Sequence, residues 1–171
     1  MTLDVIAYAY KYNAWATDGL LKSMEQLTPE QYAAPGCSGH GSIRDTFAHF
    51  MASQHAWVSW YEGKITVSDA IKLRLQPDDV ATVAQARQRW LPILAQTDAF
   101  IAGLTDDRIH QFLEWGIPNG PSGKSRMWQM LLHTANHGTH TRAQVVAAIR
   151  RAGYTPGNIE MLTYVMTHPD D

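Results

Sequence analysis

The sequence has little cysteine, no basic excess and no long apolar run, and each shortage excludes a class of protein. Its single cysteine, Cys37, excludes a disulfide framework and zinc sites built from several cysteines. Its 14 Lys and Arg are outnumbered by 16 Asp and Glu, so it lacks the basic excess that neutralises nucleic-acid phosphates. No apolar run approaches the roughly 20 residues of a membrane span, and the N-terminus has no basic signal-peptide segment. We therefore expect a cytoplasmic protein with neither a nucleic-acid nor a membrane partner.

What the chain has is ample apolar surface arranged with helical periodicity. Hydrophobic residues make up 45% of the 171 residues and charged residues 18%, which excludes disorder and predicts one domain over residues 1–171. Apolar residues recur at spacings of three and four, typical of amphipathic helices. The predicted helices cover residues 3–27, 42–63, 78–104 and 126–152, with a short one over 158–166. Four helices of about 20–25 residues indicate an all-α four-helix bundle.

Capping and turn residues set the predicted ends of these helices. Ser42, followed by Asp45, resembles a capping box at the start of the second helix. The other signals are Asp78-Asp79 and Ser125 at the starts of the third and fourth helices, Gly153 at the end of the fourth, and Pro92 as a kink. Residues 35–41 read as a loop. The turn signal Pro118-Asn119-Gly120-Pro121 predicts a short hairpin or loop. The stretches 63–77 and 105–125 allow crossovers.

Histidine is the unusual component, because eight occur in the chain and three of them fall in the fourth helix. His133, His137 and His140 lie within about 60° of one another on one helix face. Neighbours four or three residues apart can bind one metal, whereas His133 and His140 lie about 10 Å apart, too far for bonds of about 2.1 Å. His137 is therefore the shared ligand. A third ligand must come from another helix, and His49 in the second helix is the best candidate.

The histidines could instead have a purely structural role, as hydrogen-bonded residues of the core. A single core histidine such as His49 is more often hydrogen-bonded than metal-bound, but three on one helix favour metal or catalytic use. The remaining histidines have no such pattern: His55 points to another face, while His40, His110 and His168 fall in loops or near the tail. Cys37 has no neighbour in sequence that lowers its pKa, so we expect an unreactive thiol.

Three segments of the chain resemble the DinB/YfiT-like superfamily of metal-dependent enzymes. They are Tyr12-Asn13-Ala14-Trp15-Ala16, the run from Gly41 to His49 (Gly-Ser-Ile-Arg-Asp-Thr-Phe-Ala-His), and His133-x-x-Asn136-His137-Gly138-Thr139-x-x-Arg142-x-Gln144. Their order and spacing cover nearly the whole chain.

The resemblance carries expectations about fold, cofactor and activity. It implies an up-down-down-up bundle and a homodimer. It implies a divalent ion, nickel or zinc, held by three histidines: one from the second helix and an H-x-x-x-H pair from the fourth. It also implies a small-molecule substrate and the use of a low-molecular-weight thiol. Asn136, Arg142, Asp45 and Gln144 are candidates to support the ligands or to pair the helices.

One residue departs from the family pattern. The second ligand of the fourth helix is expected four residues after His137, where this chain has Thr141, and a neutral hydroxyl is a poor ligand beside imidazole. His140 could substitute, His133 could pair with His137, or the site could be reduced to His49 and His137. We favour a site of His49, His137 and His133, because this set keeps the spacing of four residues.

Two functions remain open on the sequence. The first is a metal-dependent transferase or hydrolase acting on a small thiol or electrophile. The second is a non-catalytic binding or dimerisation bundle whose metal site is degenerate at Thr141.

Overall fold

The computed structural model describes residues 1–37, 39–117 and 119–170, and most of these residues are helical. The long helices are α1 (Leu3–Met24), α3 (Ile43–Tyr61), α5 (Val83–Ala102) and α7 (Met127–Arg151). The shorter ones are α2 (Pro29–Ala33), α4 (Val67–Lys72), the 3-10 helix η1 (Pro77–Val80), α6 (Asp106–Ile109) and α8 (Met161–Thr167). The prediction of a mainly helical chain is confirmed.

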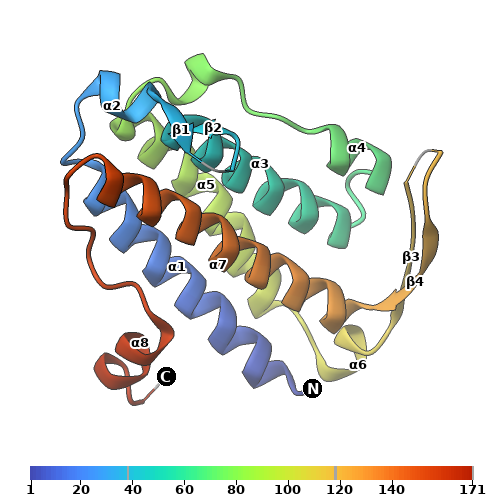
Figure 1. Cartoon of the computed structure of the whole chain (residues 1–171). Helices are drawn as coiled ribbons and strands as arrows, with labels where there is room; N and C mark the ends of the chain where they lie inside the picture. Colours follow the sequence, from blue (N-terminus) through green and yellow to red (C-terminus); the bar gives the residue numbers. More distant parts are fainter. Residues whose placement is uncertain (38, 118, 171) are drawn as a thin grey trace.

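The four long helices run beside one another, with α3 packed against α5 and α7, and α1 packed against α5 and α7 (Figure 1). Their apolar faces meet in two clusters of buried side chains, because each helix presents a hydrophobic residue every three or four positions. One cluster includes Leu20, Phe47 and Val145, and the other includes Tyr61 and Leu131. Among the described residues, no helix has the length and hydropathy needed to cross a bilayer.

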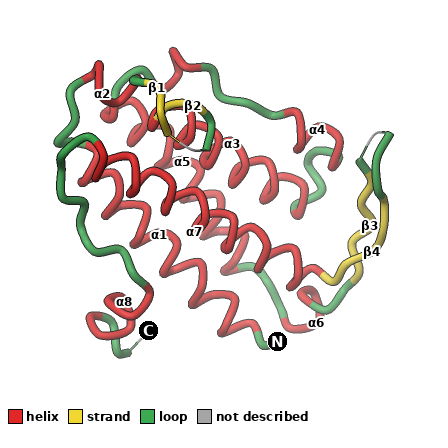
Figure 2. Tube along the Cα trace, in the orientation of Figure 1, coloured by secondary structure: helices red, strands yellow, loops and turns green. Residues whose placement is uncertain are grey.

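Over the part of the chain that the structure describes, the strands form two short antiparallel pairs (Figure 2). Strands β3 (Phe112–Gly116) and β4 (Ser122–Arg126) form the predicted hairpin, and Asn119 adopts a left-handed conformation with φ 57° in its turn. Pro118, part of the predicted turn, lies outside the described residues. Residues 35–41 were predicted to be a loop, but the first and last of them belong to the paired strands β1 (Pro35–Cys37) and β2 (Gly41–Ser42), so the prediction is wrong there. Ser38, between the two strands, also lies outside the described residues.

One predicted helix start and one predicted cap are wrong. Helix α5 begins at Val83 rather than at Asp78, because Thr82 provides the N-cap and Asp78 and Asp79 belong to η1. Ser125 does not cap α7; it lies in β4, paired with Leu113. Short helices occupy both predicted crossovers, and α8 begins three residues later than predicted.

Other local predictions are confirmed. The Ser42 side chain accepts a hydrogen bond from the backbone N–H of Asp45, 3.0 Å away, at the start of α3. Gly153, with φ 89°, follows the end of α7, where the left-handed conformation favours glycine. Pro92 lies inside α5, which continues through it, and the kink expected there stays a prediction. The start of α3 and the end of α7 therefore lie close to their predicted positions.

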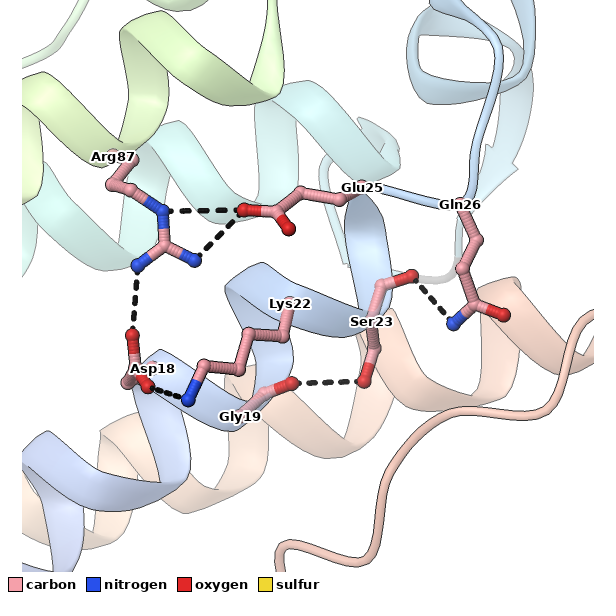
Figure 3. A network of polar contacts seen from close by, with 7 residues as sticks. All are labelled: Asp18, Gly19, Lys22, Ser23, Glu25, Gln26 and Arg87. Carbon is pink, nitrogen blue, oxygen red and sulfur yellow. Dashed lines mark hydrogen bonds and ion pairs between the residues drawn. The ribbon is translucent and has the colours of Figure 1, made fainter.

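Polar contacts and aromatic rings add to the apolar packing. Arg87 of α5 contacts Asp18 of α1 and Glu25, the residue that caps the C-terminus of α1, and so joins the two helices (Figure 3). The C-terminal helix α8 packs on α1 through the Tyr164 ring, whose centroid lies 5.4 Å from that of Trp15. The segment after α7 therefore returns to the first helix.

Candidate metal centre

The histidines of α3 and α7 meet where these two helices pack together. The Nε2 atoms of His49 and His137 lie 3.1 Å apart, and their ring planes are inclined at 71°. The hydroxyl oxygen of Ser53, one turn after His49, lies 3.4 Å from the same His49 nitrogen. Both rings are half-buried. The structure thus brings together the two residues that the sequence singled out, one from each helix.

The surroundings favour neutral imidazoles at this site. Burial, and then the neighbouring His40, His137 and Arg74, lower the pKa of His49 to about 4. Burial and the adjacent histidines also lower the pKa of His137. A neutral imidazole keeps a nitrogen lone pair, which is the form that binds a metal ion. Without a metal, one ring donates a hydrogen bond to the other.

The separation of the two nitrogens is compatible with metal binding. Two imidazole nitrogens at bonds of about 2.1 Å from one ion, at angles near 90–110°, stand roughly 3.0–3.4 Å apart. The observed 3.1 Å between the Nε2 atoms falls in this range. The pair therefore fits adjacent ligand positions of one ion.

The two candidates for a third ligand on α7 also contact other side chains. His133 is exposed, its ring centroid 6.3 Å from that of His137 and its plane perpendicular to the Trp57 ring at 5.7 Å. His140 is also exposed, and its Nε2 lies 3.0 Å from the side-chain nitrogen of Gln144. Their assignment as ligands stays a prediction.

Thr141, at the position where the family pattern expects a histidine, faces the protein interior. It is buried, and its hydroxyl donates a hydrogen bond to the backbone carbonyl of His137 at 2.8 Å. Over residues 1–37, 39–117 and 119–170, no three His, Cys, Asp or Glu side chains are arranged to hold an ion. The His49–His137 pair fits a metal, but the described residues do not form a complete three-histidine centre.

His40 is the residue that the sequence analysis missed. Its ring stacks on that of His49, with centroids 3.8 Å apart and planes inclined at 29°. Burial and the charge of Arg74 lower its pKa. The sequence did offer a signal, since His40 precedes by only two residues the N-cap of the helix that carries His49. Periodicity could not use it, because His40 lies outside any helix.

The family-pattern residues Asn13, Gly138 and Arg142 pair the helices. The Arg142 guanidinium hydrogen-bonds the Asn13 side chain of α1, and Gly138 leaves room for this contact. Asp45 accepts from the Nε of Arg44 at 2.8 Å, so its carboxylate pairs near the start of α3. The buried thiol of Cys37 accepts a hydrogen bond from the Thr46 hydroxyl at 3.2 Å. These contacts support the helices around the histidine pair.

The fold and the site define a class: a mainly helical protein in which two neighbouring long helices present paired neutral histidines. Comparison with known proteins gives the family. A family model described as "DinB family" matches residues 2–171, so this chain belongs to the DinB family. It is also similar to "Protein DinB" of Bacillus subtilis (strain 168), with 27% identity over 146 residues, covering 85% of this chain and 84% of the relative.

Proposed function

We propose that this protein binds a divalent ion, nickel or zinc, through His49 and His137, and acts as a transferase or hydrolase on a small molecule. The carrying observation is the pair of Nε2 atoms, 3.1 Å apart, on two different helices. Membership of the DinB family supports the same interpretation. The proposal includes a DinB-type four-helix bundle over residues 1–171, built from α1, α3, α5 and α7, and a cytoplasmic homodimer.

The residues of the site suit this role. His49 and His137 are neutral, and Ser53 offers a hydroxyl beside them. A divalent cation supplies Lewis acidity, which makes a thiol or a water molecule easier to deprotonate at neutral pH. A low-molecular-weight thiol as the sulfur donor needs no part from Cys37, whose sulfur is buried against α7.

A second candidate function is favoured by Thr141. Its buried hydroxyl is bonded to the backbone of α7 at the position where a third ligand is expected. In this alternative the bundle binds or dimerises without catalysis, and its metal site is degenerate.

Metal content separates the two candidates. The protein is purified without a histidine tag, and its metal is measured by elemental analysis beside His49→Ala, His137→Ala and Thr141→His. An enzyme of the proposed kind holds close to one equivalent, which both alanine variants lose because each removes one of the two paired nitrogens.

The opposite pattern supports the alternative. Wild-type protein with little metal, unchanged in both alanine variants, would contradict metal-dependent function. If Thr141→His then raised the content from near zero to one equivalent, the site would be degenerate at this residue. A tight equivalent in the wild type removes the main support for the non-catalytic bundle.

A further inference from the structure

We propose that His40 supplies the third imidazole of the metal site, from the turn that precedes α3. This inference rests on the proposed function, since it completes the same site. It replaces a ligand on α7, where the family pattern expects one, with a ligand outside the long helices.

The position of the His40 ring carries the argument. Its centroid lies 3.8 Å from that of His49, closer than the 6.3 Å between the rings of His133 and His137. His49 is therefore flanked by two imidazoles, His137 from α7 and His40 from the turn. Imidazole is a ligand common to zinc and nickel sites, and a third one would meet the usual set of protein ligands.

The backbone at His40 is fastened to α3. Its N–H donates to the hydroxyl oxygen of Thr46, 3.1 Å away, and Thr46 is fully buried. The Thr46 hydroxyl in turn donates to the sulfur of Cys37, 3.2 Å away, at the other end of the turn. These two hydrogen bonds hold the backbone of His40 in place, and so set the position from which its side chain extends.

Gly39 shows how closely this turn approaches the two helices. A Cβ atom at residue 39 would overlap the side-chain oxygen of Gln144 on α7 and would stand 2.8 Å from Cγ2 of Thr46 on α3. Only a residue without a side chain brings the backbone this close. The position of His40 is therefore set by contacts to both helices that carry the other two histidines.

In this proposal the His40 ring turns out of its stack on His49 to bind the metal. Stacked rings do not direct their nitrogens at a common point, which agrees with the lack of a complete three-ligand group among the described residues. His40 is exposed, and exposed side chains change rotamer on the picosecond to nanosecond timescale. A small cavity of about 190 Å³, lined by His40, His49 and Asp45 among others, adjoins both rings.

Cobalt(II) binding to the metal-free protein tests this assignment. Affinity is measured by titration calorimetry, and the coordination by the visible absorption of Co²⁺, for wild type, His40→Ala, His133→Ala and His140→Ala. We expect His40→Ala to weaken binding by at least about 100-fold, because even residues that only support a ligand contribute 10–100-fold. Its absorption spectrum also changes. The matched variants at the two exposed histidines of α7 bind Co²⁺ as the wild type does.

A second variant guards against an indirect effect of the first. Gly39→Ala keeps the imidazole but displaces the turn, so we expect it to weaken Co²⁺ binding as well. We expect the melting temperature of His40→Ala to equal the wild-type value, which would show that its loss of binding does not come from unfolding. Unchanged affinity in His40→Ala, with loss in His133→Ala or His140→Ala, would overturn the role of His40 and leave the proposed function intact. A wild-type protein that binds no Co²⁺ would overturn both.

Discussion

Arg142 is a fully buried arginine held by neutral groups. Its guanidinium donates to the side chains of Asn13 and Thr17 on α1 and to Thr139 on its own helix. The rings of Tyr12 and Phe50 lie 5.5 Å and 5.9 Å from its central carbon, close enough for cation–π attraction. Burial lowers its pKa, but a guanidinium stays charged at neutral pH. Arg142 thus connects α7 to α1 and α3.

Gly138 makes this arrangement sterically feasible. A Cβ at this position would lie 2.5 Å from the Asn13 side-chain oxygen and 3.2 Å from the Phe50 ring. Overpacking of this kind costs about 1–3 kcal/mol, and alanine gains roughly 1 kcal/mol over glycine in a helix, which offsets part of that cost. We expect Gly138→Ala to lower the free energy of unfolding by about 1 kcal/mol in urea denaturation, the middle of the range that remains.

The exposed Asn136 on the same helix provides the control. Asn136→Ala should change the free energy of unfolding by less than about 0.5 kcal/mol, as surface substitutions usually do. A Gly138→Ala variant as stable as the wild type would show that α1 and α7 can separate without loss.

At the scale of the element, the start of α5 shows how a cap outweighs a charge pattern. Asp78 and Asp79 would suit the positive end of a helix dipole, yet they lie in η1, and α5 begins after Thr82. The Thr82 hydroxyl accepts from the N–H of Gln85 at 3.2 Å, and the Gln85 side chain accepts from the N–H of Thr82 at 2.9 Å. This reciprocal pair satisfies two backbone donors that would otherwise lack partners.

Thr82→Ala removes half of this capping box. We expect it to lower the free energy of unfolding by about 1 kcal/mol, because loss of an N-cap hydroxyl typically costs that much. Asp78→Ala, at the start that the charge pattern predicted, should change it by less than about 0.5 kcal/mol. Equal losses in both variants, measured by urea unfolding, would contradict a helix start at Thr82.

At the scale of the whole molecule, charge pairs join helices that are far apart in sequence. Arg87 of α5 contacts Asp18 at 2.7 Å and Glu25 at 2.9 Å, and Lys22 contacts Asp18 at 2.7 Å (Figure 3). Burial raises the pKa of Asp18, but the hydrogen bonds and charges of Lys22 and Arg87 outweigh it and lower the pKa below 3.8. The folded state therefore favours the ionised carboxylate.

This direction fixes how the contribution depends on pH. A carboxyl group whose pKa is lower in the folded state stabilises the protein above its unfolded pKa, and the stabilisation is lost as pH falls through the folded pKa. Asp18→Asn should therefore lower the free energy of unfolding at pH 6, by less than about 1 kcal/mol for a solvent-exposed pair. The difference from wild type should shrink below pH 3.8, the ordinary pKa of Asp.

Asp98 gives a control of opposite sign, since burial raises its pKa. Asp98→Asn should raise the free energy of unfolding at pH 6, with the gain fading in acid. Urea unfolding of both variants between pH 6 and pH 3 measures the two trends. A difference between Asp18→Asn and wild type that grows as the pH falls would contradict the role of its ion pairs.

Local sequence determined the helices, the hairpin and one pair of histidines. Apolar spacing predicted all four long helices, and turn residues predicted the pairing of β3 with β4, because both depend on residues near one another in the chain. Histidine spacing on the fourth helix and the family resemblance singled out His137 and His49, and the structure brings them within hydrogen-bonding distance.

Only the tertiary structure decided which other groups join them. The ring of His40 stacks on His49 because the Thr46 hydroxyl accepts a hydrogen bond from the backbone of His40, in a turn that has no helical periodicity. Arg142 contacts Asn13, which is 129 residues away in the sequence. Such contacts depend on how side chains of several elements fill a shared space, which no local pattern encodes. The sequence thus determined that histidines would gather between α3 and α7. Packing decided that the His40 ring stacks on His49, while the His133 ring lies against Trp57 and His140 lies beside Gln144.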